Sequence, residues 1–124
     1  EKVGETPEAL RDLSVSLDRV GDAAQALGRL EEAQAAYTES LALRRRLLEK
    51  VGETPEALRD LSVSLERVGG NARALGKLAE SEKSLEEALL VWHRLALAFP
   101  HTTEYRKSIA RVERRLAQPL SGKP

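Results

Sequence analysis

Apolar side chains recur three and four positions apart along the first part of the chain, with polar residues between them. This spacing places one apolar stripe along one side of an α-helix. The first stripe consists of Leu10, Leu13, Leu17, Val20, Ala24 and Leu27. The same spacing returns 48 positions later in Leu58, Leu61, Leu65, Val68, Ala72 and Leu75. Both segments are therefore predicted to be amphipathic helices.

Each of these segments is followed by a second stripe with the same helical spacing. In the first copy it runs through Leu30, Ala33, Tyr37, Leu41 and Leu48. In the second copy it runs through Leu78, Ser81, Leu85, Leu89, Trp92 and Ala96. No segment alternates with a period of two, so no strand is predicted. Five helices are expected, over about 7–27, 30–50, 55–75, 78–98 and 102–117.

Start and stop signals flank these stripes. The triplets Thr6-Pro7-Glu8 and Thr54-Pro55-Glu56 each provide a capping hydroxyl, a proline for the first helical position and an acid for the first turn. Gly28 and Gly76 separate the stripes as helix-ending glycines do. Val51-Gly52 and Phe99-Pro100 are predicted to end the second helix of each copy.

The two copies form an internal repeat with a period of 48 residues. Residues 1–21 and 49–69 differ only at Asp18, which is replaced by Glu66. A partial third copy follows, in which Tyr105, Ile109, Val112 and Leu116 keep the offset. Repetition at such a period is typical of solenoids, in which each unit packs on its neighbours.

The hairpin resembles the tetratricopeptide repeat, whose pattern is W-x2-L-G-x2-Y, then A-x3-F, then P. The first copy matches this pattern through Leu17, Val20, Gly21, Ala24, Ala33 and Tyr37. The second copy matches it through Leu65, Val68, Gly69, Ala72, Ser81 and Leu85. The resemblance covers residues 7 to about 117.

Two features depart from that family. Its usual period is about 34 residues, and its final proline is replaced here by Arg45 and His93. Both departures fit a variant in which each helix is longer by about two turns, although HEAT-like helical repeats have similar lengths. The resemblance implies an all-α superhelix of two antiparallel hairpins and a C-terminal capping helix. Its domain would span 1–117, with repeats over about 7–50 and 55–98, a capping helix over about 102–117 and a disordered tail over 118–124.

Composition limits the classes of function. Lys plus Arg and Asp plus Glu both number 20, so the chain lacks the basic surplus that nucleic-acid binding needs, and no membrane association is expected. There is no cysteine, which excludes disulfides and thiolate metal sites and suits the cytoplasm. No apolar run approaches the length of a membrane span, and EKVGETPEAL lacks a signal-peptide pattern.

Candidate chemistry is sparse. His93 and His101 are eight positions apart with Pro100 between them, which does not fit a helical metal pair. The stretch around Gly76-Lys77 lacks the first glycine and the Ser/Thr of a phosphate-binding loop. The serines at 14, 16, 62 and 64 have no base beside them and fit packing or surface positions. We therefore predict no enzyme, no cofactor and no metal site.

The family resemblance implies that the first helix of each hairpin lines a concave surface that holds peptides. The aligned positions are Val15, Asp18, Asp22, Gln25, Val63, Glu66, Arg67, Arg73, Arg111, Arg114 and Arg115, with Arg19 and Gly70 beside them. Carboxylates near one end and arginines near the other argue against a clamp for a C-terminal carboxylate. They favour a partner of opposite polarity, or alternatively charges that pair with one another and keep the face soluble.

The two ends of the repeat array are predicted to differ. The last helix has one apolar stripe and is otherwise charged, as a solenoid cap requires. The first helix carries the apolar surface of the third, which suggests a segment of a longer array or self-association, including a swap between chains. Trp92, which replaces Arg44 of the first copy, is predicted to pack against the last helix. The function predicted is a scaffold that binds a protein or peptide, and the alternative is a self-assembly module through the first helix.

Overall fold

The computed structural model describes residues 5–118, and it is built from helices without a strand in that range. The helices are α1 (Pro7–Ala26), α2 (Leu30–Val51), α3 (Pro55–Ala74), α4 (Leu78–Ala98) and α5 (Thr103–Ala117). Each boundary lies within one residue of the predicted one. The predicted disordered tail, apart from Gln118, lies outside the described residues.

The predicted signals set these boundaries. The hydroxyl of Thr6 accepts a hydrogen bond from the amide of Ala9 at 3.1 Å, and Thr54 caps α3 in the same way. Gly28 ends the first helix with a φ of 78°, which only glycine adopts without strain. The amides of Gly28 and Arg29 donate to carbonyls of the last turn, at 3.0 and 2.8 Å, and so close α1.

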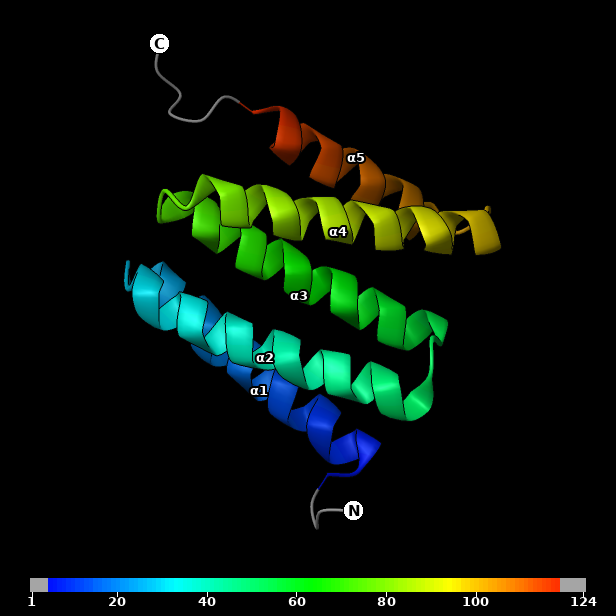
Figure 1. Ribbon diagram of the computed structural model, residues 1–124, viewed down its shortest axis with the longest axis horizontal. Coiled ribbons are helices and arrows are strands. Elements are labelled where there is room, and N and C mark those ends of the chain that lie inside the picture. The colour runs from blue at the N-terminus through cyan, green and yellow to red at the C-terminus, as the bar shows by residue number, and fades with distance from the viewer. Residues whose placement is uncertain (1–4, 119–124) are drawn as a thin grey trace.

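The helices form a stack in which each packs chiefly on its neighbours in the chain (Figure 1). Helices α1 and α2 make one antiparallel hairpin, and α3 and α4 make the next. Helix α2 packs on α3, and α5 packs on α4 at the end of the stack. The predicted all-α class of packed helical hairpins is therefore confirmed.

A glycine in each first helix lets its hairpin close. A Cβ atom placed on Gly21 would lie 2.5 Å from Cε1 of Tyr37, and one on Gly69 would lie 2.8 Å from Cγ of Leu85. Because Tyr37 and Leu85 are almost fully buried, neither can move away. The glycine of the repeat pattern therefore makes room for the side chain that fills the space between the paired helices.

The largest part of the core surrounds Trp92, which is completely buried. Its ring centroid lies 6.0 Å from that of Tyr105 on α5, which confirms the predicted packing against the last helix. The indole nitrogen donates a hydrogen bond to Glu66 at 2.8 Å. Leu65, Leu85 and Val112 complete the contacts that join α3, α4 and α5.

The apolar stripe of α1 is largely uncovered, although its sequence nearly repeats that of α3. Leu13 and Val20 expose 49% and 58% of their surface, whereas the equivalent Leu61 and Val68 expose 4% and 7%. The difference arises because α3 is covered by α2, while no described helix lies on the outer side of α1.

Candidate functional site: a groove across the first helices

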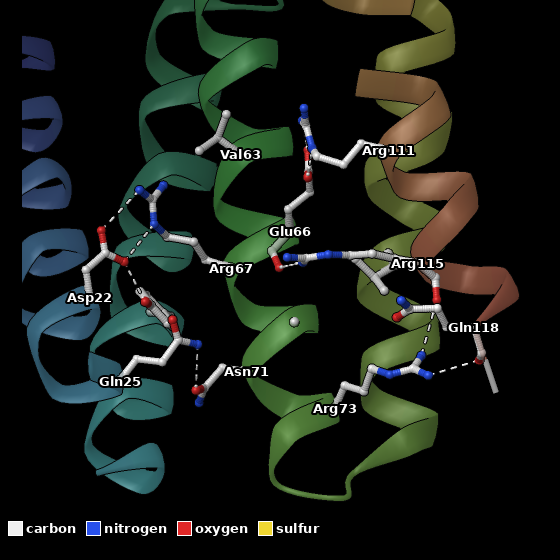
Figure 2. Close-up of a pocket in the computed structure, with 13 residues that line it drawn as sticks. Asp22, Gln25, Val63, Glu66, Arg67, Asn71, Arg73, Arg111, Arg115 and Gln118 are labelled. Atoms are coloured by element: carbon white, nitrogen blue, oxygen red, sulfur yellow. Dashed lines mark hydrogen bonds and ion pairs between the residues drawn. The ribbon is translucent and has the colours of Figure 1, made fainter. Parts of the chain in front are cut away.

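A hollow of about 470 Å³ lies across α1, α3 and α5, and we call it the groove. Figure 2 shows its polar side chains pointing toward one another from the three helices. The groove is lined by Asp22, Gln25, Tyr37, Val63, Glu66, Arg67, Gly70, Asn71, Leu85, Arg73, Arg111, Arg115 and Gln118. Tyr37 of α2 and Leu85 of α4 form its apolar floor, since they fill the space behind the two glycines.

Most of the predicted site residues lie at this groove. Those that line it are Asp22, Gln25, Val63, Glu66, Arg67, Arg73, Arg111 and Arg115. Val15 and Arg114 are exposed but do not line it, and Asp18 is buried away from it. The structure therefore brings eight of the eleven predicted residues to one groove and places Val15, Asp18 and Arg114 elsewhere.

Asp22 is held by two partners at the α1 side of the groove. The guanidinium of Arg67 donates to both of its carboxylate oxygens, at 3.2 and 3.3 Å, and the hydroxyl of Tyr37 donates at 2.5 Å. Partial burial raises the pKa of Asp22, but these hydrogen bonds outweigh it, so the pKa lies below its ordinary value. Burial and the Asp22 carboxylate raise the pKa of Tyr37, which therefore stays a donor. The charge of Asp22 is thus already neutralised by Arg67.

Glu66 corrects the sequence prediction, because it is a buried carboxylate with 9% of its surface exposed rather than an open groove charge. Arg111 donates to both of its oxygens at 2.8 Å, and Trp92 donates to Oε2. This hydrogen bonding, together with the Glu66 charge, raises the pKa of Arg111. The bidentate pair fastens α5 to α3 at the floor of the groove.

Asp18 also corrects the prediction, since it exposes only 5% of its surface and lies between the helices of the first hairpin. Its Oδ2 lies 3.0 Å from Nη1 of Arg44, which is itself buried. Arg44 also donates to Ser14 and to the backbone carbonyl of Asp60, and so bridges α1 and α3. The position faces inward because the middle of the second helix, where Arg44 and its twin Trp92 stand, packs against it.

Arg115 has no carboxylate partner within residues 5–118. It lies over Gly70, where an added Cβ would be 2.6 Å from Nη1, and among the described residues it donates to the carbonyl of Glu66 at 3.5 Å. The two upstream twins of Arg115 are Arg67, which binds Asp22, and Arg19. Arg67 finds its carboxylate at Asp22 of the preceding hairpin. The residue equivalent to Asp22 that would face Arg115 is Gly70, which has no carboxylate.

The predicted division into an acidic and a basic end is therefore corrected. Two carboxylates line the groove, Asp22 and Glu66, and each already pairs with an arginine. Arg73 and Arg115 line it as well. Arg73 donates to the carbonyls of Arg115 and Gln118, and Arg115 donates to the carbonyl of Glu66. Among the residues that line the groove, four are arginines and two are carboxylates, and Arg115 of α5 has no carboxylate partner within residues 5–118.

Asn71 is a groove residue that the sequence analysis missed. It is fully buried, donates to the carbonyl of Leu30 and to Gln34, each at 2.8 Å, and accepts a hydrogen bond from Gln25. It therefore locks α3 to both helices of the first hairpin. The sequence does mark this position, because the polar Asn71 replaces the apolar Ala23 of the first copy.

The other candidate positions lie away from the groove. His93 and His101 are exposed, and no group of three or more potential metal ligands occurs within residues 5–118. Ser14, Ser62 and Ser64 are buried between helices, while Ser16 is exposed. In the described part of the chain, no helix is both long and apolar enough to cross a bilayer.

Comparisons of the chain with models of protein families, with curated proteins and with solved structures found no match.

Proposed function

We propose that this chain is a protein-interaction module whose groove binds an extended, acidic segment of a partner protein. The observation that carries the proposal is Arg115, a guanidinium that faces the groove without a carboxylate partner among the described residues. A charged donor in a hollow between helices is stabilised by an anion that binds beside it. The carboxylates nearby are already paired, so the anion would come from the partner.

The shape of the groove favours a peptide over a compact small molecule. Pockets for small molecules are enclosed and mostly apolar, with a few placed polar groups. This hollow is open to solvent and crosses three helices, with arginine, asparagine and glutamine side chains along it. An extended chain could lie along it and present a carboxylate to Arg115, while its backbone pairs with Gln25 and Gln118.

We also propose that the chain is a long-helix member of the tetratricopeptide family. The support is the repeat pattern together with the roles its residues take in this structure. Gly21 and Gly69 leave room for Tyr37 and Leu85, which fill the space between the helices of each hairpin. Binding along the first helices is the mode of recognition that the resemblance implied.

A peptide-display selection on the folded chain tests the proposed function. The sequences enriched should be rich in aspartate and glutamate, and the best of them is then synthesised. Arg115→Glu should weaken binding of that peptide by about tenfold or more, because one charge-assisted hydrogen bond is replaced by repulsion. Arg114→Glu is the matched control, since Arg114 lies on the same helix, is exposed and does not line the groove.

Two results would count against the proposal. One is enrichment of sequences without acidic residues. The other is an equal loss of binding in the Arg114 and Arg115 variants, which would mean that the net charge of the chain, and not the groove, attracts the peptide. A circular dichroism spectrum of each variant shows that the helices are retained.

A further inference from the structure

The chain contains one surface in two states, covered on α3 and open on α1. Residues 7–21 and 55–69 differ at a single position, so the two helices present almost the same side chains. Val68 is buried against Ala33 and Tyr37, which belong to α2. Val20, its twin on α1, exposes 58% of its surface. The structure therefore shows directly what kind of element covers this surface.

The open face of α1 follows a strict spacing. Its members alternate four and three positions apart, which keeps them in line along one helix face that can meet another helix. They are Ala9, Leu13, Ser16, Val20, Ala23 and Leu27. The equivalent residues of α3 are Ala57, Leu61, Ser64, Val68, Asn71 and Leu75. Leu41 and Leu48 of α2 pack against the cluster that contains Leu61, and Arg44 of α2 donates to Ser64 at 3.2 Å.

Charged residues beside this face are also paired on α3 and open on α1. On α3, Arg67 pairs with Asp22 of α1, and Asp60 accepts a hydrogen bond of 2.6 Å from Arg11 of α1. The twins of these residues on α1 are Arg19 and Asp12. Both are exposed, and within residues 5–118 neither side chain has a hydrogen bond or an ion pair. The open face therefore carries a cation and an anion at the positions that α3 uses to hold the preceding hairpin.

We infer that the outer face of α1 is a docking surface for a further hairpin of this same repeat that is joined in tandem to α1, and not for a second copy of this chain. That hairpin is seated as the first hairpin sits on α3. Leucines of the incoming second helix cover Leu13, and the alanine and tyrosine at the positions of Ala33 and Tyr37 cover Val20. The incoming first helix supplies a carboxylate to Arg19 and an arginine to Asp12. The surface thus selects its partner in two ways. The apolar residues Leu13 and Val20 must be covered, and Asp12 and Arg19 must each meet a side chain of opposite charge.

The incoming second helix is of the α2 type, with arginine at the position of Arg44. A second helix of the α4 type, with tryptophan at that position, is covered in this structure by α5. There Tyr105 lies beside Trp92, and Val112 belongs to the same apolar cluster. At these two positions α1 instead has Ala9 and Ser16, which match Ala57 and Ser64 of α3. Alanine leaves space for a guanidinium, and the serine hydroxyl accepts a hydrogen bond from it, as Ser64 does from Arg44. The same two small side chains would not fill the space around an indole ring.

A tandem chain tests this inference. Residues 1–48 are repeated before Glu1, so the added hairpin joins through the same sequence that links the two present hairpins. Hydrogen exchange is then compared between Pro7–Ala26 in the 124-residue chain and the same helix in the tandem chain. We expect its amides to exchange about tenfold more slowly or better in the tandem chain, because covered helices open less often.

The substitution Val20→Asp provides the control. In the 124-residue chain it should leave exchange elsewhere unchanged, because Val20 is mostly exposed. In the tandem chain, introduced in the interior copy, it should remove the added protection. Unchanged exchange of α1 in the tandem chain would overturn the inference. Protection of α1 that appears in the 124-residue chain alone and rises with its concentration would overturn the assigned occupant, because the surface would then belong to a second copy of this chain.

Discussion

At the scale of single residues, the one difference within the duplicated block has a physical explanation. Asp18 faces Arg44, and Glu66 faces Trp92, so each carboxylate meets a position at which α2 and α4 differ. The shorter aspartate fits beside a guanidinium that must also reach Ser14 and Ser64. The longer glutamate reaches both the indole of Trp92 and Arg111 of α5. The length of each carboxylate side chain therefore matches the partners that it meets.

The buried pair of Arg44 and Asp18 should contribute more to stability than its exposed neighbour. Arg44→Met removes the nearer guanidinium from the buried Asp18 and leaves it only Arg67, at 3.5 Å from Oδ2. The other oxygen of that carboxylate already lacks a hydrogen bond among the described residues. We expect the free energy of unfolding in urea to fall by about 3 kcal/mol. Arg45→Met is the matched control, because Arg45 pairs with Glu87 at the surface, and it should cost less than about 1 kcal/mol. Equal losses would contradict the bridging role of Arg44.

Asp22 should make the stability of the chain depend on acid. Because its pKa is lower in the folded state than its ordinary 3.8, its contribution is present in full above that value and disappears as the pH falls through the folded pKa. Asp22→Asn should therefore lower the free energy of unfolding near neutral pH, by less than about 1 kcal/mol for a half-exposed group. The difference between variant and parent should vanish in strong acid, and a difference that persists there would show another cause.

At the scale of helices, the glycines fall into two groups. Some must lack a side chain because a neighbouring helix packs directly against them, and others could carry one. Gly21 and Gly69 face buried side chains, as described above. Gly70 faces the end of the flexible Arg115 side chain, which can move aside. The repeat separates the two adjacent glycines, since Gly69 aligns with Gly21 and Gly70 aligns with Asp22.

Alanine at these glycines should have effects of opposite sign. Gly21→Ala places a methyl group against the ring of Tyr37, which we expect to cost about 1 to 3 kcal/mol by overpacking. Gly70→Ala should leave stability unchanged or raise it by up to about 1 kcal/mol, because alanine is the better helix former. Thermal unfolding of the two variants beside the parent provides the comparison. A stabilised Gly21 variant would contradict the close approach of α1 and α2.

The helices were predictable because their signals are local. Thr6, Pro7 and Gly28 specify a start and a stop from a few consecutive residues, so the predicted and observed boundaries agree closely. The groove was predictable in part, since the repeat aligns the first helices. The inward direction of Asp18 and Glu66 was not, because their partners stand 26 residues further along the chain, on the second helix. Charge type alone does not show which carboxylates a neighbouring helix will cover.

At the scale of the whole molecule, the stack places identical sequences in different environments. Leu13 and Leu61 occupy the same position of the repeat, one half-exposed and the other almost fully buried. Leu61→Ala should lower the free energy of unfolding by about 3 kcal/mol through the cavity it leaves. Leu13→Ala should lower it by less than about 1 kcal/mol. Urea unfolding of both variants measures the difference, and similar losses would mean that α1 is covered as fully as α3.

The central claim is that an acidic segment binds in the groove across α1, α3 and α5. The most direct measurement follows backbone amide shifts in a nuclear magnetic resonance spectrum while an acidic peptide from the selection is added. We expect the largest changes at groove residues of α3 and α5, such as Gly70, Asn71 and Arg115. Changes confined to the outer faces of α2 and α4, or none at saturating peptide, would contradict it.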